Sequence, residues 1–319
     1  MPSLTLELGV KTDPIEYRYS FDWLFRLMAE EGVRHIQLGS FFEIYQFPDD
    51  FFTDLKQLAI NYGLSITSLF TAHRELGGFL RNEHPAWQAV ARRNYERLIE
   101  VGALLGAESV GSNPGAVMRD QMHFKAEGIR RYLEHIKVMM AYAHRQGVSC
   151  LTIEPMSCLA EPPTLPDEIR DMAEELLDHH RQHPGQTATM GYCVDVAHGY
   201  ANQNGSVQWN NMELLKAALP YINHLHLKNT DPVFSSTFGF SEAEREKGIV
   251  DIGTVRELLF SHADVIPVNT LVGYLELSGP KTGRDYSDYK LEGMLRESLR
   301  YLKATFPTSV ELGEGQQAG

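Results

Sequence analysis

Short apolar runs alternate with segments of helical periodicity along nearly the whole chain. A run of four to eight mostly apolar residues between polar segments is typical of a buried strand. Eight such runs occur, in the order LTLELGV (4–10), RHIQLGS (34–40), LSITSLFTA (64–72), AESVGSN (107–113), SCLTIEP (149–155), GYCVDVA (191–197), INHLHLK (222–228) and LVGYLEL (271–277). The pattern therefore predicts eight strands.

The segments between these runs place apolar residues three and four positions apart, as Phe21, Leu24, Phe25 and Met28 illustrate, which predicts amphipathic helices. Further helices are predicted in the segments 50–61, 95–105, 124–146, 165–181, 211–219, 253–262 and 288–303. Strict alternation of strand and helix requires parallel strands, because each helix carries the chain back across the sheet.

Eight such units fit a single (β/α)8 TIM barrel over residues 1–304. The competing arrangement is a doubly wound open sheet. That fold typically has a glycine-rich, phosphate-binding turn after its first strand, and the segment GVKTDP does not have this pattern. The segment 229–251 is long for a loop between strand and helix and mixes aromatic with charged residues, so we expect a lid there. We expect a disordered C-terminal tail over residues 305–319, where no pattern is visible.

The composition narrows the class of protein. The chain has 319 residues, 43% hydrophobic and 22% charged, as a globular protein has. Its 29 Lys and Arg against 42 Asp and Glu give a net charge of −13, which disfavours nucleic acid as a partner. Neither a membrane helix nor a signal peptide is indicated, and the three cysteines form no CxxC pair. We therefore expect a cytoplasmic protein without a membrane partner, a disulfide framework or a thiolate zinc site.

Polar side chains end the last four apolar runs. These residues are Glu154, Asp195 followed by His198, His226 and Glu276. In a (β/α)8 barrel the carboxyl ends of the strands meet at the face that carries the chemistry. Because side chains alternate along a strand, His224 and His226 share the lumen side while Leu225 and Leu227 point outward. The deeper His224 is predicted to be a core histidine rather than a ligand.

Three carboxylates and one imidazole at one level form a hard, mostly oxygen site that suits Mn²⁺, Mg²⁺, Co²⁺ or Zn²⁺. Without a cation, three neighbouring carboxylates would repel one another. The alternative interpretation is four separate buried polar residues, each with local partners.

At these residues the sequence resembles the xylose isomerase-like TIM-barrel superfamily, in particular the sugar phosphate isomerase and epimerase branch that includes D-tagatose and D-psicose 3-epimerases. The pieces that carry the resemblance are IEP, DVAH, HLHLKNTD and YLELS, and the likeness extends over roughly residues 4–304. The resemblance implies one divalent metal, Mn²⁺ first among the candidates, held by Glu154, Asp195, His226 and Glu276. It also implies that Glu154 and Glu276 exchange protons with the substrate and that His198 binds a substrate hydroxyl.

Two departures concern the substrate. The epimerases carry another Glu a few residues past the first ligand and an Arg about six residues past the histidine, whereas here Glu161 is one position off and Pro232 replaces the Arg. Lys228 offers a substitute cation for a phosphate or carboxylate. Other candidate substrate contacts are His73, Arg74, Asn113 and Lys11. The glycine-rich turn GSNPG (residues 111–115) is a further candidate, because its backbone N–H groups could bind an anion.

More narrowly, ELGVKTDPIEYRYSFDWLFRLMAEEGV and TAHRELGGF resemble the tetrulose-phosphate epimerases of bacterial erythritol catabolism. This resemblance implies an erythrulose phosphate inverted at C3 through an enediolate. A metal-dependent aldose–ketose isomerase is the main alternative, and a dehydratase of inositol-type keto sugars and a non-catalytic sugar-binding barrel are also open. The expected partner is a small sugar or sugar phosphate, and a homo-oligomer such as a dimer is compatible with the sequence.

A DNA-repair enzyme related to AP endonuclease is a remote alternative from the same superfamily. Its three-metal site requires further ligands, one of them at the fourth strand end, where this chain has Asn113, and an Asp-x-His pair after the seventh strand, which is absent. The net charge of −13 also opposes a DNA partner.

Overall fold

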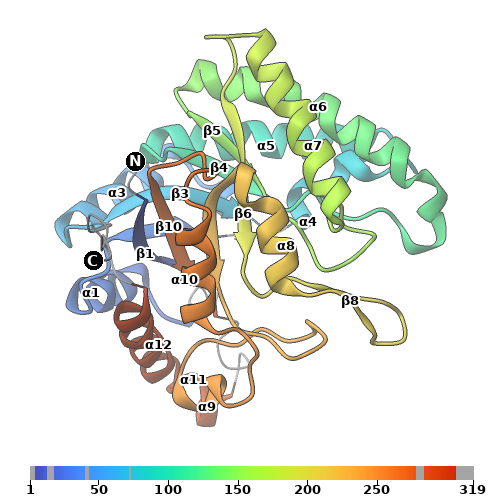
Figure 1. Ribbon diagram of the computed structural model, residues 1–319. Coiled ribbons are helices and arrows are strands. Elements are labelled where there is room, and N and C mark those ends of the chain that lie inside the picture. The colour runs from blue at the N-terminus through green and yellow to red at the C-terminus, as the bar shows by residue number, and fades with distance from the viewer. Residues whose placement is uncertain (1–3, 13–17, 40–42, 72, 278–283, 307–319) are drawn as a thin grey trace, which may run out of the picture.

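The computed structural model describes residues 4–12, 18–39, 43–71, 73–277 and 284–306 of the chain, and eight parallel strands close into a barrel at its centre (Figure 1). The barrel strands are β1 (Thr5–Lys11), β2 (His35–Leu38), β3 (Ser65–Thr71), β4 (Ser109–Ser112), β5 (Cys150–Ile153), β6 (Thr189–Asp195), β9 (Ile222–Leu227) and β10 (Thr270–Leu275). Their order around the barrel is β1-β10-β9-β6-β5-β4-β3-β2. The (β/α)8 TIM barrel and all eight predicted strands are thereby confirmed.

Helices surround the barrel on its outer side (Figure 1). The longer ones are α1 (Phe21–Glu30), α3 (Asp49–Asn61), α5 (Ala86–Leu105), α6 (Lys125–Gln146), α7 (Pro166–Gln182), α8 (Asn211–Ala218), α10 (Ile252–Ser261) and α12 (Leu291–Thr305). Each presents an apolar face inward, and α1 buries Leu24, Phe25 and Met28 as its periodicity predicts. Within the described ranges, no helix is long and apolar enough to cross a membrane.

Several one-turn helices and one hairpin lie in the connections between these elements. The short helices are α2 (Glu43–Gln46), α4 (His73–Leu76), α9 (Glu242–Arg245), α11 (Asp285–Asp288) and the 3-10 turns η1 (Gly77–Leu80), η2 (Arg119–Phe124) and η3 (Leu219–Tyr221). The strands β7 (Tyr200–Ala201) and β8 (Val207–Trp209) form an antiparallel hairpin that projects from the barrel (Figure 1). The sequence pattern did not predict these elements, because two to six residues are too few to establish a period.

The barrel lumen contains a layer of polar side chains. On β9, Leu225 and Leu227 belong to the hydrophobic core, whereas His224 and His226 contact polar side chains of other strands. This arrangement confirms the alternation expected for the strand. The polar layers of the lumen lead directly to the strand ends, where the candidate ligands lie.

The segment 229–251 folds back on itself after β9. Asn229 and Phe238 pair as an antiparallel bridge, and Asn229 Oδ1 accepts a hydrogen bond from the backbone N–H of Val250 at 2.7 Å. The carboxylate of Asp231 accepts hydrogen bonds from backbone and side-chain donors of the same loop, Ser235 among them, which hold its pKa well below the usual range. At the other end of the chain, α12 runs to Thr305, and residues 307–319 of the expected tail lie outside the described part.

Candidate metal centre

The four predicted ligands come from four consecutive strands of the barrel wall. Glu154 directly follows β5, Asp195 ends β6, His226 lies within β9, and Glu276 directly follows β10. The backbone register pairs His226 with Asp195 on one neighbouring strand and with Tyr274 on the other. Parallel pairing therefore brings all four side chains to one level at the carboxyl ends of the strands.

The side chains converge on a common point. Each residue offers one ligand atom, and these atoms all lie within 4.8 Å of one another. His226 Nδ1 lies 2.9 Å from Glu154 Oε1 and 3.1 Å from Glu276 Oε2. Asp195 and His226 are 1% and 0% exposed, whereas the side chain of Glu276 is 20% exposed, so solvent reaches the cluster from the side of Glu276. The structure thus brings together the four residues that we predicted from their positions at the strand ends.

The charges in this cluster reinforce one another. Burial alone raises the pKa of Glu154, but the imidazole of His226 outweighs it and lowers the pKa to about 2. Burial likewise raises the pKa of Glu276, and the ammonium groups of Lys11 and Lys228 bring that pKa far below its usual range. For His226, burial lowers the pKa, while Cys193 and the two glutamates together raise it well above its ordinary value. Both glutamates are therefore ionised at neutral pH.

The donor set fits a divalent cation. Three carboxylates with one imidazole are ligands that Mn²⁺, Mg²⁺, Co²⁺ and Zn²⁺ accept. Glu276 Oε2 is buried and accepts no hydrogen bond from the described residues, although Lys11 Nζ forms an ion pair with it at 3.5 Å. Lys228 Nζ lies 2.5 Å from Asp195 Oδ2. The cluster thus gathers positive charge around buried carboxylates, which a bound cation would also provide.

His198 lies at the edge of the cluster and faces Lys228. Its Nδ1–H donates to the backbone carbonyl of Pro155 at 2.7 Å, which leaves Nε2 as an acceptor. Nε2 lies 3.2 Å from Lys228 Nζ and 3.4 Å from Asp195 Oδ2. The predicted substrate contacts His198 and Lys228 therefore stand together beside the ligand Asp195.

Asn113 directly follows β4, so it also lies at a strand end. Its Oδ1 is buried and has no hydrogen-bond partner among the described residues. A buried amide oxygen without a donor is costly and is common where a ligand completes the site. His73 and Arg74 lie in α4, but their side chains are outside the described part of the structure.

Two glycines of the segment GSNPG, Gly111 within β4 and Gly115 after it, have packing roles. A Cβ atom at Gly111 would collide with Thr152 on the adjacent strand. Gly115 has a φ of 98° and packs closely against Gly77. Both glycines are explained without an anion, so the turn itself gives no support for a phosphate site.

The sequence reasoning missed the residue that binds the far side of the His226 ring. Gln37 on β2 places its Oε1 2.7 Å from His226 Nε2 and is completely buried. It was detectable only as the polar residue between Ile36 and Leu38, which places it on the lumen side of its strand.

His224 lies one layer deeper and belongs to a different environment. Its Nε2 lies 2.6 Å from Ser109 Oγ, and burial lowers its pKa to about 3. It lines a cavity of about 350 Å³ at the opposite mouth of the barrel, together with Glu7 and Glu108. His224 is 7% exposed and contacts Ser109, as expected of a core histidine.

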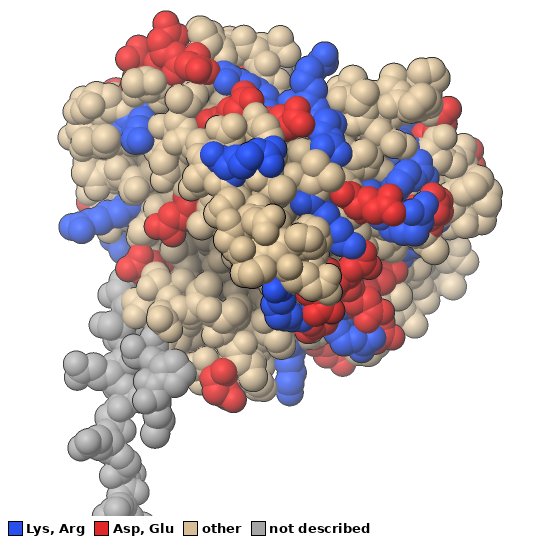
Figure 2. Space-filling model, turned by 90° about the horizontal axis from the view of Figure 1, so that it is seen from above, with Lys and Arg blue, Asp and Glu red and all other residues tan. Residues whose placement is uncertain are grey.

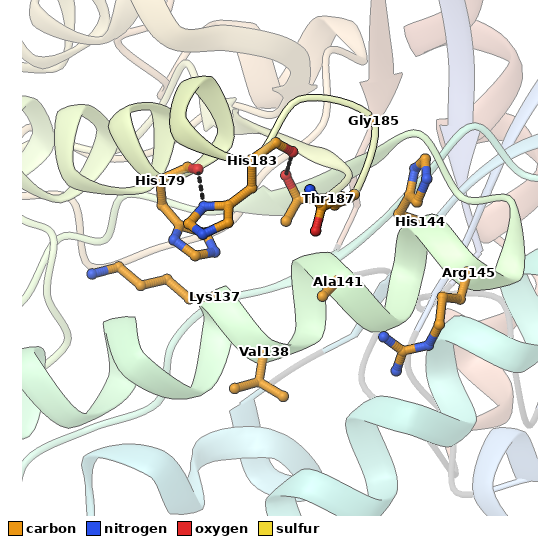
Figure 3. A pocket seen from close by; sticks show the side chains of 10 residues that line it. Lys137, Val138, Ala141, His144, Arg145, His179, His183, Gly185 and Thr187 are labelled. Atoms are coloured by element: carbon orange, nitrogen blue, oxygen red, sulfur yellow. Dashed lines mark hydrogen bonds between the residues drawn. The ribbon is translucent and has the colours of Figure 1, made fainter.

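A separate hollow of about 560 Å³ lies between α6 and α7 on the outside of the barrel (Figure 3). Basic side chains line much of it, and His183 Nδ1 donates to the carbonyl of His179 at 2.8 Å. None of the four clustered residues lines this hollow. On the face seen from above, Lys and Arg side chains are interspersed with Asp and Glu side chains (Figure 2). The strand-end cluster therefore remains the candidate functional site.

Comparisons with known proteins agree with this architecture. A family model described as a xylose isomerase-like TIM barrel matches residues 25–304. A provisionally assigned xylose isomerase from Rhodospirillum rubrum ATCC 11170 is 18% identical, with a TM-score of 0.75 over 95% of this chain and 100% of that one. D-Psicose 3-epimerase from Clostridium cellulolyticum H10, solved with D-tagatose, is 15% identical, with a TM-score of 0.67 over 94% and 99% of the two chains.

A xylose isomerase-like TIM barrel protein from Mycobacterium smegmatis, solved in complex with magnesium, is 12% identical, with a TM-score of 0.60 over 94% of this chain and 97% of that one. None of the curated proteins matches this chain. At these identities the solved structures establish a common fold.

Proposed function

Since this chain belongs to the xylose isomerase-like TIM barrel family, we propose that it is a divalent-metal-dependent epimerase that inverts C3 of a small ketose phosphate, with erythrulose phosphate the favoured substrate. The observation that carries the proposal is the convergence of three carboxylates and one imidazole within 4.8 Å at the strand ends. The likeness to an epimerase solved with a ketohexose supports this assignment.

The metal would be held by Glu154, Asp195, His226 and Glu276. Mn²⁺ is the favoured ion, and Mg²⁺, Co²⁺ and Zn²⁺ suit the same ligands. When bound, the ion makes the proton beside the substrate carbonyl more acidic and stabilises the negative charge that develops as that proton leaves. The magnesium in the Mycobacterium smegmatis protein supports a divalent ion in this fold.

Glu154 and Glu276 are the proposed acid–base pair. Inversion at one carbon requires one group to remove a proton and another to deliver a proton to the opposite face. The two residues follow β5 and β10, which are separated by two strands in the barrel wall. Because they approach the common point from different directions, each can face one side of the substrate. Which glutamate removes the proton depends on the configuration of the substrate.

His198, Lys228 and Asn113 are the proposed contacts to substrate oxygens, together with His73 and Arg74. Burial alone lowers the pKa of Lys228, but Asp195 and the glutamates hold it above its ordinary value. Lys228 is therefore a permanent cation at the rim of the site, which suits a phosphate.

The segment 229–251 is the proposed lid. It begins directly after Lys228, and its internal hydrogen bonds through Asn229 and Asp231 give it a defined shape. A loop of defined shape that moves as a unit could exclude water from the site while the substrate is deprotonated.

Isotope exchange tests the proposal directly. The metal-loaded protein is incubated in D₂O with D- and L-erythrulose phosphates, and the products are followed by NMR. We expect deuterium at C3 with inversion of that carbon. The absence of any exchange with any of the four metals would contradict the proposal.

An aldose–ketose isomerase is the second candidate, because the Rhodospirillum rubrum structure assigned to that activity superimposes with a TM-score of 0.75. Transfer of hydrogen between C1 and C2 would require the same metal and the same two glutamates, with the substrate in another orientation. In the D₂O experiment this activity would give an aldehyde product or label at C1.

A further inference from the structure

We propose that Gln37 is a positioning residue of the metal centre, which fixes the tautomer and ring orientation of His226 so that Nδ1 faces the bound ion. The inference rests on the proposed function, because it concerns the metal that Glu154, Asp195, His226 and Glu276 would hold. Gln37 contributes no ligand atom to the cluster. It acts on the opposite edge of the His226 ring, where Oε1 lies 2.7 Å from Nε2.

The geometry assigns Nδ1 as the ligand atom. Nδ1 is the ring nitrogen that approaches Glu154 and Glu276, at 2.9 and 3.1 Å, whereas Nε2 points away from them toward Gln37. A neutral imidazole can bind a cation only through the nitrogen that carries no proton. An amide oxygen at Nε2 accepts the N–H there and so leaves the lone pair of Nδ1 for the metal.

The amide nitrogen of Gln37 has two contacts of its own. Its Nε2 donates to Ser68 Oγ at 3.2 Å and to Cys193 Sγ at 3.8 Å. If the amide were flipped, its NH₂ group would face His226 and could donate only to an Nε2 that carries no proton. The flipped arrangement would favour a proton on Nδ1, where a metal could not bind.

The hydrogen bonds continue from Ser68 toward the deeper layer of the lumen, and an aromatic ring contacts His226. Ser109 Oγ donates to Ser68 Oγ at 3.0 Å and lies 2.6 Å from His224 Nε2. Gln37 and Ser68 are completely buried, so the described side chains supply the hydrogen bonds that water would otherwise make. Phe70 packs edge-on against the ring of His226, with 5.0 Å between ring centroids. The imidazole is thus restrained both at its Nε2 edge and by this aromatic contact.

Metal titration of matched variants tests the inference. Dissociation constants for Mn²⁺ and Co²⁺ are measured by calorimetry for the wild type, Gln37→Leu, Gln37→Glu and Ser109→Ala. Loss of a residue that orients a metal-binding histidine typically weakens binding by about 10- to 100-fold, and we expect that loss for Gln37→Leu. Gln37→Glu keeps an acceptor for Nε2–H, so its affinity should stay within about fivefold of the wild type. Ser109→Ala, two hydrogen bonds further away, should also change it by less than about fivefold.

The ring nitrogens of His226 provide a second measurement, made on the wild type and therefore independent of how any variant folds. In the Zn²⁺-loaded protein, ¹⁵N NMR should show a proton on Nε2 and the metal on Nδ1. Metal bound through Nε2 would overturn the inference, as would a Gln37→Leu variant that binds Mn²⁺ with wild-type affinity. Equal loss of affinity in Gln37→Leu and Gln37→Glu would also overturn it, because the acceptor at Nε2–H, which Gln37→Glu keeps, would then not account for the affinity.

Failure of this inference can be told apart from failure of the proposed function. If the wild type binds none of the metals, the proposed metal centre itself is wrong. If the wild type binds metal and Gln37→Leu binds it equally well, the metal centre stands and only the role of Gln37 is rejected.

Discussion

Two histidines on one strand of this barrel show how strongly the surroundings determine what a side chain can do. His226 and His224 lie two residues apart on β9, both point into the lumen, and they are 0% and 7% exposed. His226 lies among carboxylates at the carboxyl ends of the strands, and its pKa is well above the ordinary value despite its burial. His224 lies one layer deeper beside Ser109, and burial lowers its pKa to about 3.

The difference comes from the neighbours, because residue type, strand and burial are shared. At the upper layer, Glu154 and Glu276 stabilise a positive charge on the ring or an ion in its place. At the lower layer, the nearest polar group is a hydroxyl, which offers no compensating charge. Burial without a contacting carboxylate therefore makes a neutral core histidine, and burial beside carboxylates makes a candidate metal ligand.

The largest expected effect follows from removing the charge of either upper-layer glutamate. Glu154→Gln or Glu276→Gln should lower kcat about 10³-fold at saturating Mn²⁺, because an amide can neither accept the substrate proton nor return it. The matched control is Glu108→Gln at the opposite mouth of the barrel, which should change kcat by less than about threefold. Steady-state rates measure both, and wild-type turnover in both upper-layer variants would remove these residues from the proposed mechanism.

The two histidines can be compared directly by the same substitution. His226→Ala should weaken Mn²⁺ binding by about 100-fold or more, since a ligand is lost and not only a residue that orients one. His224→Ala should leave the affinity within about fivefold of the wild type but lower the free energy of unfolding by about 1–3 kcal/mol, because Ser109 loses a buried partner. Calorimetry and chemical denaturation separate the two effects, and a comparable loss of affinity in both variants would show that the layers are not distinct.

The pH dependence of stability provides a third test, on the metal-free protein. The pKa of His224 is about 3 when folded against 6.5 as its ordinary value, so between these values the unfolded chain binds the proton and the folded chain does not. Stability should therefore fall as the pH decreases from 6.5 to 4.5, by about 1 kcal/mol per pH unit from this residue. His226 acts oppositely: its raised pKa contributes stability that is present below pH 6.5 and is lost as the pH rises through the folded value.

The difference between the wild type and His224→Gln isolates the lower histidine, because other titrating groups are common to both proteins. Denaturant unfolding at pH 6.5, 5.5 and 4.5 should give a shallower loss of stability for the variant. Parallel curves for the two proteins would indicate that His224 is protonated in the folded state.

Most of the barrel was predictable from the sequence because its strands and long helices repeat the same apolar periods. The hairpin of β7 and β8 was missed because strands of two and three residues have no period to detect. Gly111 and Gly115, in and after β4, illustrate a different limit. Their collisions with Thr152 and Gly77 depend on how neighbouring segments pack, so the sequence equally suggested an anion-binding turn.

The four candidate ligands of the site were predictable from the sequence, but the residue behind them was not. Glu154, Asp195, His226 and Glu276 each lie at or next to the carboxyl end of a strand, and parallel strands in a barrel necessarily bring such positions to one face. Gln37 lies on a strand on the far side of the barrel, and only the closure of the barrel places it against His226. A single polar residue within an apolar run indicates its face but not its partner.

For Lys228 the sequence and the structure suggest different roles. Its substitution has the smallest predicted effect. The sequence suggested a cation for the substrate, and the structure places its Nζ 2.5 Å from Asp195 Oδ2 and 3.2 Å from His198 Nε2. If Lys228 also binds the phosphate, Lys228→Met should raise KM for a ketose phosphate about tenfold, the value of one charge-assisted hydrogen bond. KM for the unphosphorylated ketose should change little, because that substrate has no anion for Lys228 to bind. Initial rates with the two substrates measure this ratio. An equal rise in both KM values would instead indicate that Lys228 does not bind the phosphate. Its role would then be to hold Asp195 and His198 in position.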